Sequence, residues 1–387
     1  MGPLAGITVI EFAGLGPAPF CGMMLSDLGA EVIRVDRADD RRPRAKDVLS
    51  RGRRSIAVNL KSDAGRDVVL RLCADADAII EGFRPGVMER LGLGPDVLLA
   101  ANPKLVYGRM TGWGQDGPLA KAAGHDPNYI ALTGALHAIG RSGEKPVLPL
   151  NLIGDFGGGG MLLAFGVVSA LLSASRTGAG QVVDAAMVDG AATLMALIYG
   201  LNATGVHRDE RGANFLDGAA HFNDVYETAD GKFISIASLE KPFYDQLIGL
   251  LGLDPAESAG HMDRRNWARL KALFTQTFKQ KTRDDWCALL EGTDVCFAPV
   301  LSLAEAPLHP HMAARGTFQT HDGMMQPSPS PRFSRTEAAI SGPSRDPGAD
   351  TIEILVNAGL KLSEIDALIS AGAVRRHTDP STEGAPA

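Results

Sequence analysis

The feature that most constrains the fold is a regular alternation of short β-branched runs and amphipathic segments near the N-terminus. Residues 7–12 (ITVIEF) predict a strand, which ends at a glycine-rich turn at 14–16. Residues 20–29 have the apolar spacing of a helix, and residues 31–35 (EVIRV) predict a second strand. Strand, helix and strand in this order form a βαβ unit, whose two strands lie parallel in one sheet.

The same alternation continues toward residue 110. Strands are predicted at 55–60, 78–81 and 105–110, and helices at 63–74 and 95–100. This rhythm predicts an α/β fold, in which a large Rossmann-like, doubly wound domain with a parallel sheet occupies residues 1–190. Beyond it, a strand is predicted at 231–238 and helices at 241–251 and 263–278. The predicted organisation is a linker at 191–222, a small α+β domain at 223–307, a linker at 308–335, and a C-terminal return to the large domain with a tail at 336–387.

Composition narrows the range of functions. The chain has 387 residues, of which 45% are apolar and 6% aromatic, and its net charge is −7. Nucleic-acid-binding surfaces are basic and contain aromatic residues, so this composition argues against nucleic-acid binding. The apolar run at 161–174 is interrupted by Gly166 and Ser169 and is shorter than the roughly 20 residues that cross a bilayer, so no membrane span is expected. The N-terminus lacks a signal-peptide pattern, and the four cysteines lack metal-ligand spacing. We therefore expect a cytoplasmic protein with reduced thiols and no metal.

The first turn is similar to a dinucleotide-binding motif. A strand, Gly14-Leu15-Gly16 and a helix are followed by Asp36, twenty residues after Gly16. However, Pro19 stands where the motif needs its third glycine, and Pro17 removes a backbone N–H that a pyrophosphate would use. We therefore expect a tight strand-to-helix turn and no dinucleotide cofactor.

A strongly basic segment lies inside this acidic chain. Residues 34–61 contain ten arginines or lysines and four aspartates, a net charge of +6. Guanidinium groups match phosphate oxygens in geometry and charge, and the segment follows the second strand, where α/β folds bind ligands. The segment favours a phosphorylated small molecule, and coenzyme A, with its 3′-phosphate and diphosphate, fits it well. The alternative is a solvated loop with scattered ion pairs.

Two motifs in the centre of the chain carry candidate acid–base groups. His125 and Asp126 are neighbours in GHDPNY (124–129), and Asp155 precedes four glycines in PLNLIGDFGGGG (149–160). Glycines inside a helix cost about 0.8–1.0 kcal/mol each, so the run indicates a close backbone approach. On spacing alone, a helix N-cap is the favoured explanation of Asp155, and a buried structural role is the favoured explanation of His125.

With these motifs the sequence resembles the α-methylacyl-CoA racemases, members of the family III CoA-transferase (CaiB/BaiF) superfamily. The similar stretches are residues 2–37, 81–95, 110–118, 123–129, 149–160, 180–192, 211–218 and 331–335. The resemblance implies an enzyme that inverts the α-carbon of a 2-methylacyl-CoA thioester, with no cofactor because CoA is part of the substrate. It also implies an interlocked homodimer.

The resemblance assigns roles to individual residues. The implied catalytic residues are His125, Asp155 and Glu240, with Glu240 supporting the aspartate across the subunit boundary. Contacts to CoA are implied for Arg37, for the strand end formed by Ile56, Ala57, Val58 and Asn59, for Arg84 and Arg90, and, at the thioester end, for Gly124, Asp126 and Tyr129.

Inversion of an α-carbon needs an acid and a base on opposite faces of a planar enolate. Neutral His125 removes the proton from one enantiomer while protonated Asp155 donates to the other face. Asp155 then requires a raised pKa, and we expect the carboxylate of Glu240 to raise it by like-charge repulsion. Backbone N–H groups near His125 and Asp126 are expected to bind the enolate oxygen.

Two other functions and one departure from the family pattern stay open. A CoA-transferase would use Asp155 as an acyl-accepting nucleophile, and a non-catalytic protein would bind acyl-CoA without exchanging its α-proton. Residues Ala219, His221 and Asn223 depart from the loop that racemases carry near the acyl group. His221 is either an additional polar contact to the acyl chain or an inert change in that loop.

Overall fold

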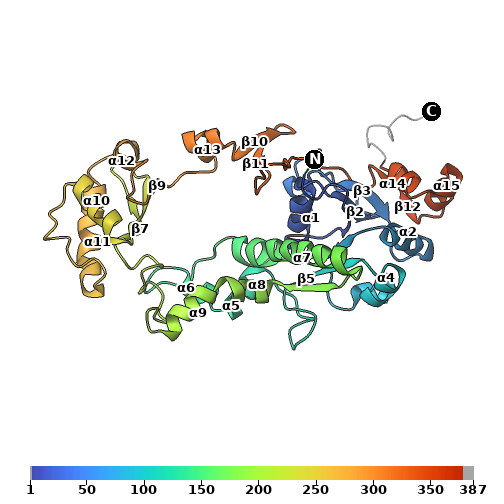
Figure 1. Cartoon of the computed structure of the whole chain (residues 1–387), viewed down its shortest axis with the longest axis horizontal. Helices are drawn as coiled ribbons and strands as arrows, with labels where there is room; N and C mark the ends of the chain where they lie inside the picture. The colour runs from blue at the N-terminus through green and yellow to red at the C-terminus, as the bar shows by residue number, and fades with distance from the viewer. Residues whose placement is uncertain (1, 378–387) are drawn as a thin grey trace. The chain divides into compact units, whose positions relative to one another are not determined.

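The computed structural model describes residues 2–377, which form two compact units (Figure 1). Within the described residues, unit 1 comprises the chain up to Thr133, Leu150–Leu194 and the residues from Gly316 onward. Unit 2 comprises Gly134–Pro149 and Met195–Arg315. The last part of the predicted tail, from residue 378, lies outside the described residues.

Unit 1 is built on a seven-stranded sheet with the strand order β12-β3-β2-β1-β4-β5-β6. Six strands run parallel: β1 (Thr8–Phe12), β2 (Glu31–Arg37), β3 (Arg54–Val58), β4 (Ala78–Glu81), β5 (Val106–Thr111) and β6 (Val182–Ala186). The short β12 (Val374–Arg375) pairs antiparallel with β3. The predicted parallel α/β sheet is confirmed. Strand order reverses between β1 and β4, and open α/β sheets bind ligands at such a switch point.

Helices cover both faces of this sheet. On one face lie α1 (Pro17–Asp27) and α7 (Leu162–Thr177); on the other lie α2 (Asp63–Ala74), α4 (Pro95–Ala101), α14 (Thr351–Asn357) and α15 (Leu362–Ser370). Figure 1 shows α14, α15 and β12, from the far end of the chain, beside α2 and β3. Unit 1 also contains α3 (Val87–Arg90), α5 (Asp126–Leu132), α8 (Met187–Leu194), the one-turn helix η1 (Val48–Ser50), and a hairpin of β10 (Phe318–His321) and β11 (Met324–Pro327).

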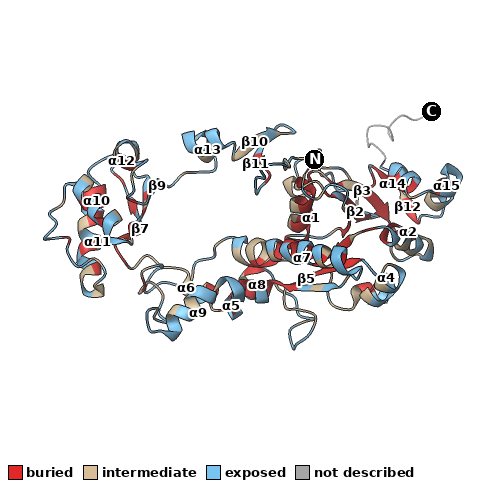
Figure 2. Cartoon of the chain, in the orientation of Figure 1, coloured by how far each residue is buried: buried red, intermediate tan, exposed pale blue. Residues whose placement is uncertain are grey.

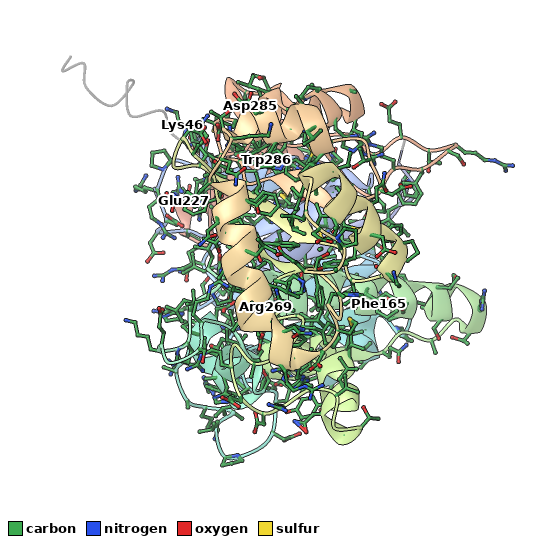
Figure 3. All side chains as sticks on the ribbon, turned by 90° about the vertical axis from the view of Figure 1, so that its left-hand side faces the viewer. Lys46, Phe165, Glu227, Arg269, Asp285 and Trp286 are labelled. Atoms are coloured by element: carbon green, nitrogen blue, oxygen red, sulfur yellow. The ribbon has the colours of Figure 1, made fainter. Side chains whose placement is uncertain are left out.

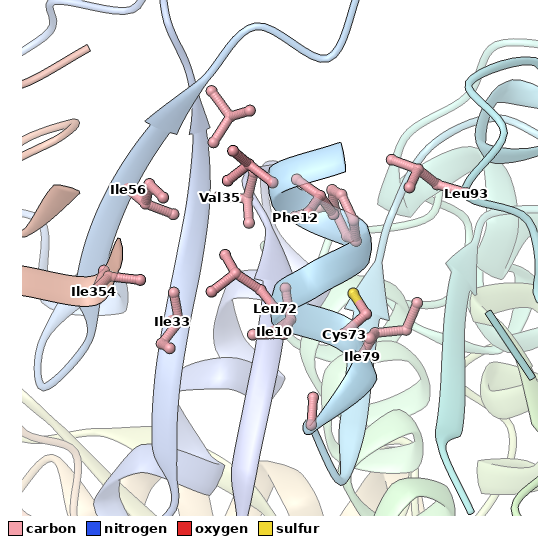
Figure 4. Close-up of a cluster of buried hydrophobic side chains, with 14 of the residues drawn as sticks. Ile10, Phe12, Ile33, Val35, Ile56, Leu72, Cys73, Ile79, Leu93 and Ile354 are labelled. Atoms are coloured by element: carbon pink, nitrogen blue, oxygen red, sulfur yellow. The ribbon is translucent and has the colours of Figure 1, made fainter. Parts of the chain in front are cut away.

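The core of unit 1 follows from the two-residue period of its strands. Ile10 and Phe12 of β1 pack with Leu72 of α2 on one face (Figure 4), whereas Val9 packs with Leu25 of α1 on the other. The strands are therefore buried on both sides, as the red ribbons of Figure 2 show. This explains why they form continuous β-branched runs in the sequence.

The glycine-rich segment is helical throughout. It forms a π-helix, η2 (Leu152–Met161), that continues directly into α7. The four glycines permit the close backbone approach expected from the sequence: a Cβ on Gly158 would lie 2.6 Å from the backbone nitrogen of Ala191, and one on Gly160 would lie 2.6 Å from the carbonyl oxygen of Pro17. The helix therefore packs against α8 and α1 with almost no side chain between the backbones.

The combined helix is longer than the interrupted apolar run predicted from the sequence. Among the described residues, Leu152–Thr177 is the one helix whose length and apolar composition would allow it to cross a membrane. Its buried side chains, such as Leu163 and Val167, belong to the core cluster on the sheet. This packing gives the helix a structural role inside unit 1.

Unit 2 has a small antiparallel sheet of β7 (Asn223–Glu227), β8 (Phe233–Ala237) and β9 (Phe297–Pro299), in that order. Its helices are α6 (Ala135–Ala138), α9 (Ala196–Ala203), α10 (Lys241–Leu251), α11 (Arg264–Phe278), α12 (Arg283–Leu290), η3 (Ala306–Leu308) and α13 (Pro310–Arg315). The core is aromatic and includes Phe274 and Trp286. Figure 3 labels Trp286 next to Asp285, and the two neighbours on α12 differ in burial because only the indole faces this core.

His221 belongs to the core of unit 2. Its side chain is fully buried, its Nε2 lies 3.0 Å from the hydroxyl of Tyr244, and its ring packs edge-on against Phe222 and Phe274. Burial lowers the pKa of this imidazole to about 3. Of the two explanations of His221 left open by the sequence, the polar contact to an acyl chain does not hold, because the side chain is enclosed by aromatic rings, and the inert change in the loop is the one that fits.

Candidate functional site

A cavity of about 770 Å³ lies at the carboxyl ends of the central strands of unit 1. Its walls come from the turns that follow the strands: residues 15–17 after β1, 82–85 after β4, 112–113 after β5, and Met187 after β6. Strands β1 and β4 flank the switch point of the sheet. The cavity thus occupies the place where an α/β sheet of this order binds its ligand.

Two predicted catalytic residues, His125 and Asp155, line this cavity. His125 directly precedes α5, and its backbone N–H donates to Oδ1 of Asn128 at 3.0 Å. Asp155 is the fourth residue of η2, whose capping position is held by Asn151, so the N-cap explanation does not apply. Residues from two motifs distant in sequence are therefore brought to one cavity.

A carboxylate next to the two catalytic candidates joins the starts of their helices. Oδ2 of Asp126 accepts hydrogen bonds from the backbone N–H groups of Gly154 at 2.7 Å and Asp155 at 2.8 Å. Asp126 itself is 2% exposed and is absent from the cavity lining. The sequence placed Asp126 at the thioester end but did not reveal this link, which no spacing rule could have found.

The surroundings of Asp155 favour its protonated form. Its pKa is raised chiefly by burial and further by the charge of Asp126, against the opposing effects of a hydrogen bond from Asn151 and the charge of His125. The Nδ2 group of Asn151 donates to Oδ2 of Asp155 at 3.2 Å. The shift is in the direction that the chemistry requires, and the carboxylate that adds to it within unit 1 is Asp126.

Glu240, the third predicted catalytic residue, lies in unit 2. It is exposed and occupies the capping position directly before α10. It is not among the residues that line the cavity of unit 1.

An aromatic wall supports the cavity near Gly124. Tyr129 donates its hydroxyl to the carbonyl of Gly124 and meets Trp113 edge-on, with ring centroids 4.7 Å apart. A Cβ on Gly112 would overlap the Tyr129 ring, so glycine is required there. Gly124, Tyr129 and Arg84, for which contacts to CoA are predicted, all line the cavity.

The other predicted CoA contacts are placed differently. The side chains of Ile56, Ala57 and Val58 are fully buried, and their strand is paired with β2 on one side and β12 on the other, so they are core residues. Asn59 is half-buried at the end of this strand. Arg90 is exposed at the end of α3, outside the cavity lining.

Arg37 lines a second cavity, of about 660 Å³, together with residues 39–43. Its guanidinium pairs with Asp39 at 2.6 Å, and both side chains are exposed. This surface is one exposed part of the basic segment, and it also contains Arg41 and Arg42.

Three other arginines of the basic segment have structural roles. Arg34, Arg51 and Arg53 are buried and pair with Asp36, Asp27 and Glu11 respectively. Asp36 also accepts a hydrogen bond from the hydroxyl of Ser55 at 2.7 Å, so its carboxylate is not available to a ribose. The segment therefore combines ion pairs buried in the core of unit 1 with a basic surface exposed on the same unit.

Comparisons of the chain with a family model, with curated proteins and with solved structures all point to one family. The family model described as CoA-transferase family III matches residues 4–351. The chain is 46% identical over 366 residues to the alpha-methylacyl-CoA racemase of Mus musculus and 44% identical over 365 residues to that of Homo sapiens, in each case covering 94% of this chain and 95% of the relative. A crystal structure of a CaiB/BaiF family protein from Brucella suis matches with a TM-score of 0.79 at 29% identity, covering 92% of this chain and 99% of that one.

Proposed function

We propose, from the premise that this chain belongs to CoA-transferase family III, that it is a racemase interconverting (2R)- and (2S)-2-methylacyl-CoA thioesters. The observation that carries the proposal is that His125 and Asp155 line one cavity at the switch point of the sheet. A second support is the identity of 46% to a mouse racemase over nearly the whole chain.

The proposed reaction uses the two residues as an acid–base pair. Neutral His125 takes the α-proton of one enantiomer, the electron pair moves onto the thioester oxygen as an enolate, and protonated Asp155 returns a proton to the opposite face. In the reverse direction the Asp155 carboxylate is the base and the His125 imidazolium is the acid. The raised pKa of Asp155 supports this assignment, because the residue must hold a proton near neutral pH in one direction.

The enolate oxygen requires a hydrogen-bond donor. The backbone N–H of His125 already donates to Asn128, whereas the N–H of Asp126 has no acceptor among residues 2–377. We propose that the Asp126 N–H stabilises the enolate, since a donor fixed before the reaction costs no reorganisation as charge develops.

The CoA moiety is proposed to extend from this cavity over the basic surface. Arg84, Gly124 and Tyr129 contact the thioester end, and Arg37, Asn59 and Arg90 are available to the adenosine and phosphate groups. The exposure of Arg37 and Arg90 supports this role, because a phosphate can reach their guanidinium groups without disrupting the core.

A homodimer is proposed as the working form. The exposed side of η2 and α7 presents Met161, Phe165, Val168 and Leu172 at helical spacing, and Phe165 is 72% exposed (labelled in Figure 3). A contiguous apolar face of this kind favours burial against a second copy. In this proposal Glu240 supports Asp155 across the subunit boundary. A cytoplasmic location stays a prediction from the sequence.

Proton NMR of a 2-methylacyl-CoA ester in heavy water tests the function. The wild-type protein is expected to exchange the α-proton and to convert either enantiomer to a mixture, and His125→Ala and Asp155→Ala are each expected to abolish interconversion. The transferase alternative predicts a different pattern: no exchange, transfer of CoA to an added carboxylic acid, an acyl group trapped on Asp155, and indifference to the loss of His125. That pattern would overturn the racemase proposal.

A further inference from the structure

We propose that Asp126 is a positioning residue. Its carboxylate holds His125 and Asp155 at a fixed separation and places a negative charge next to Asp155. This inference rests on the proposed racemase function and deepens it. It assigns to the Asp126 side chain a role separate from that of its backbone N–H at the thioester end.

The first support is the geometry of the link. The opening N–H groups of a helix have no partner inside the helix, and those of Gly154 and Asp155 are both satisfied by one oxygen, Oδ2 of Asp126. His125 is attached to Asp126 by one peptide bond. One buried carboxylate thus connects the backbone of both catalytic residues, and any displacement of it would change their separation.

The second support is the requirement for glycine at position 154. A Cβ on Gly154 would lie 2.7 Å from Oδ2 of Asp126 and 3.2 Å from its Cα. A side chain here would therefore push the carboxylate out of hydrogen-bonding position. The glycine before Asp155 in the GDFGGGG motif is explained by this contact.

The third support is the incomplete hydrogen bonding of the carboxylate. Oδ1 of Asp126 is buried and has no hydrogen-bond partner among the described residues. A buried acceptor without a partner is costly, so a purely structural cap would be served better by a neutral side chain. The charge is therefore available to act on its neighbour, Asp155.

The negative charge of Asp126 shifts the pKa of Asp155 upward. The groups that face Asp155 are Asp126, which raises its pKa, and His125 and Asn151, which lower it; burial is the largest contribution and raises it. Tyr129 also lies near Asp155, with Arg84 beside it. Removal of the Asp126 charge therefore lowers the pKa of Asp155.

Asp126→Asn separates charge from geometry. An asparagine can place its amide oxygen where Oδ2 lies and keep both hydrogen bonds, with its amide nitrogen where Oδ1 lies. The rate of α-proton exchange is measured against pH for each enantiomer. We expect each pH profile to keep its shape, while the limb that reports the titration of Asp155 moves to lower pH. Above that limb, the direction in which Asp155 donates slows about tenfold for each pH unit by which the limb moves.

Asp126→Ala and Gly154→Ala remove the link itself. Both are expected to reduce kcat by about 100-fold with little change in KM, because the two acid–base groups lose their separation while the cavity remains. The matched control is Asp77→Asn, since Oδ2 of Asp77 accepts the backbone N–H of Thr8 at 2.8 Å, at the amino end of β1. This control is expected to keep the wild-type pH profile.

The outcomes are distinguishable. If Asp126→Asn retains the wild-type pH profile, and Asp126→Ala loses activity only in proportion to its unfolded fraction by circular dichroism, Asp126 is a structural cap and the inference is overturned. If the wild-type protein itself exchanges no α-proton, the proposed function fails and the inference fails with it.

Discussion

Gly158 of η2 and Gly190 of α8 touch through their backbones: a Cβ added to Gly190 would overlap the carbonyl group of Gly158. The helix that carries Asp155 is thus held against its neighbour by a contact between main chains. Rigid backbone surrounds the contact, so it cannot be relieved by a rotamer change.

Gly190→Ala is therefore expected to destabilise unit 1 by about 1–3 kcal/mol, the usual range for overpacking a core. Because the displaced helix carries Asp155, α-proton exchange should fall as well. Urea unfolding and the exchange assay check both effects. Gly200→Ala is the matched control: it lies in α9 with nothing within 4 Å of the added Cβ, so stability there should be unchanged or slightly higher.

Asn151→Ala is expected to move the pH profile in the direction opposite to Asp126→Asn. The amide of Asn151 donates to Asp155 and stabilises its charged form, so its loss raises the pKa of Asp155 further. The limb that reports Asp155 should then lie at higher pH. Exchange rates of both enantiomers measured against pH provide the check, and a displacement of the limb to lower pH would contradict the assignment.

His221 is expected to make stability depend on pH. The hydroxyl of Tyr244 donates to the carbonyl of Ser258, so Nε2 of His221 carries the proton that bonds to this hydroxyl, and Nδ1 is buried without a partner among the described residues. The lowered pKa means that the unfolded chain takes up a proton below about pH 6.5 while the folded one stays neutral to about 3. Stability is therefore full above pH 6.5 and falls by up to about 1.4 kcal/mol per pH unit below it.

The variant that tests this is His221→Gln, whose amide can donate to Tyr244 but does not titrate. Urea unfolding of unit 2, monitored by its tryptophans at about pH 7.5 and about pH 5, should show a smaller difference for the variant than for the wild-type protein. Equal differences would show that another group causes the acid sensitivity.

Arg53→Met is expected to cost about 3–5 kcal/mol of unfolding free energy, because the substitution leaves an uncompensated charge in the core. Arg53 and Glu11 are both fully buried and paired, and Arg53 also donates to the carbonyl of Pro19 at 3.0 Å. Adding Glu11→Gln should recover part of the loss. Urea unfolding measures both changes. Lys241→Met, which breaks the exposed pair with Asp245, is the control and should have no measurable effect.

Phe165→Glu is expected to shift the protein toward the monomer. It places a charge in the middle of the exposed apolar face of α7, where a second copy is proposed to pack. Light scattering after size-exclusion chromatography measures the mass. Leu362→Glu, at the exposed start of α15, is the control for added charge. A dimer of unchanged stability in the Phe165 variant would place the interface elsewhere.

The local sequence pattern predicted secondary structure well where neighbouring residues govern it. The helices at 63–74 and 241–251 and the strand at 78–81 have the predicted bounds, because hydrophobic period and turn residues are recorded along the chain itself. The π-helix η2 was missed, since four consecutive glycines disfavour a helix unless close packing elsewhere requires them.

The sequence by itself determined which residues carry the proposed chemistry, since His125 and Asp155 stand in distinctive motifs. Tertiary structure alone decided the surroundings of individual side chains. It bonded the Asp126 carboxylate to the backbone of Gly154 and Asp155. It also buried strand residues 56–58 in the core and His221 among aromatic rings. The physical reason is that a motif records residue types at fixed spacing. Burial, hydrogen-bond partners and pKa values depend on which distant segments pack together.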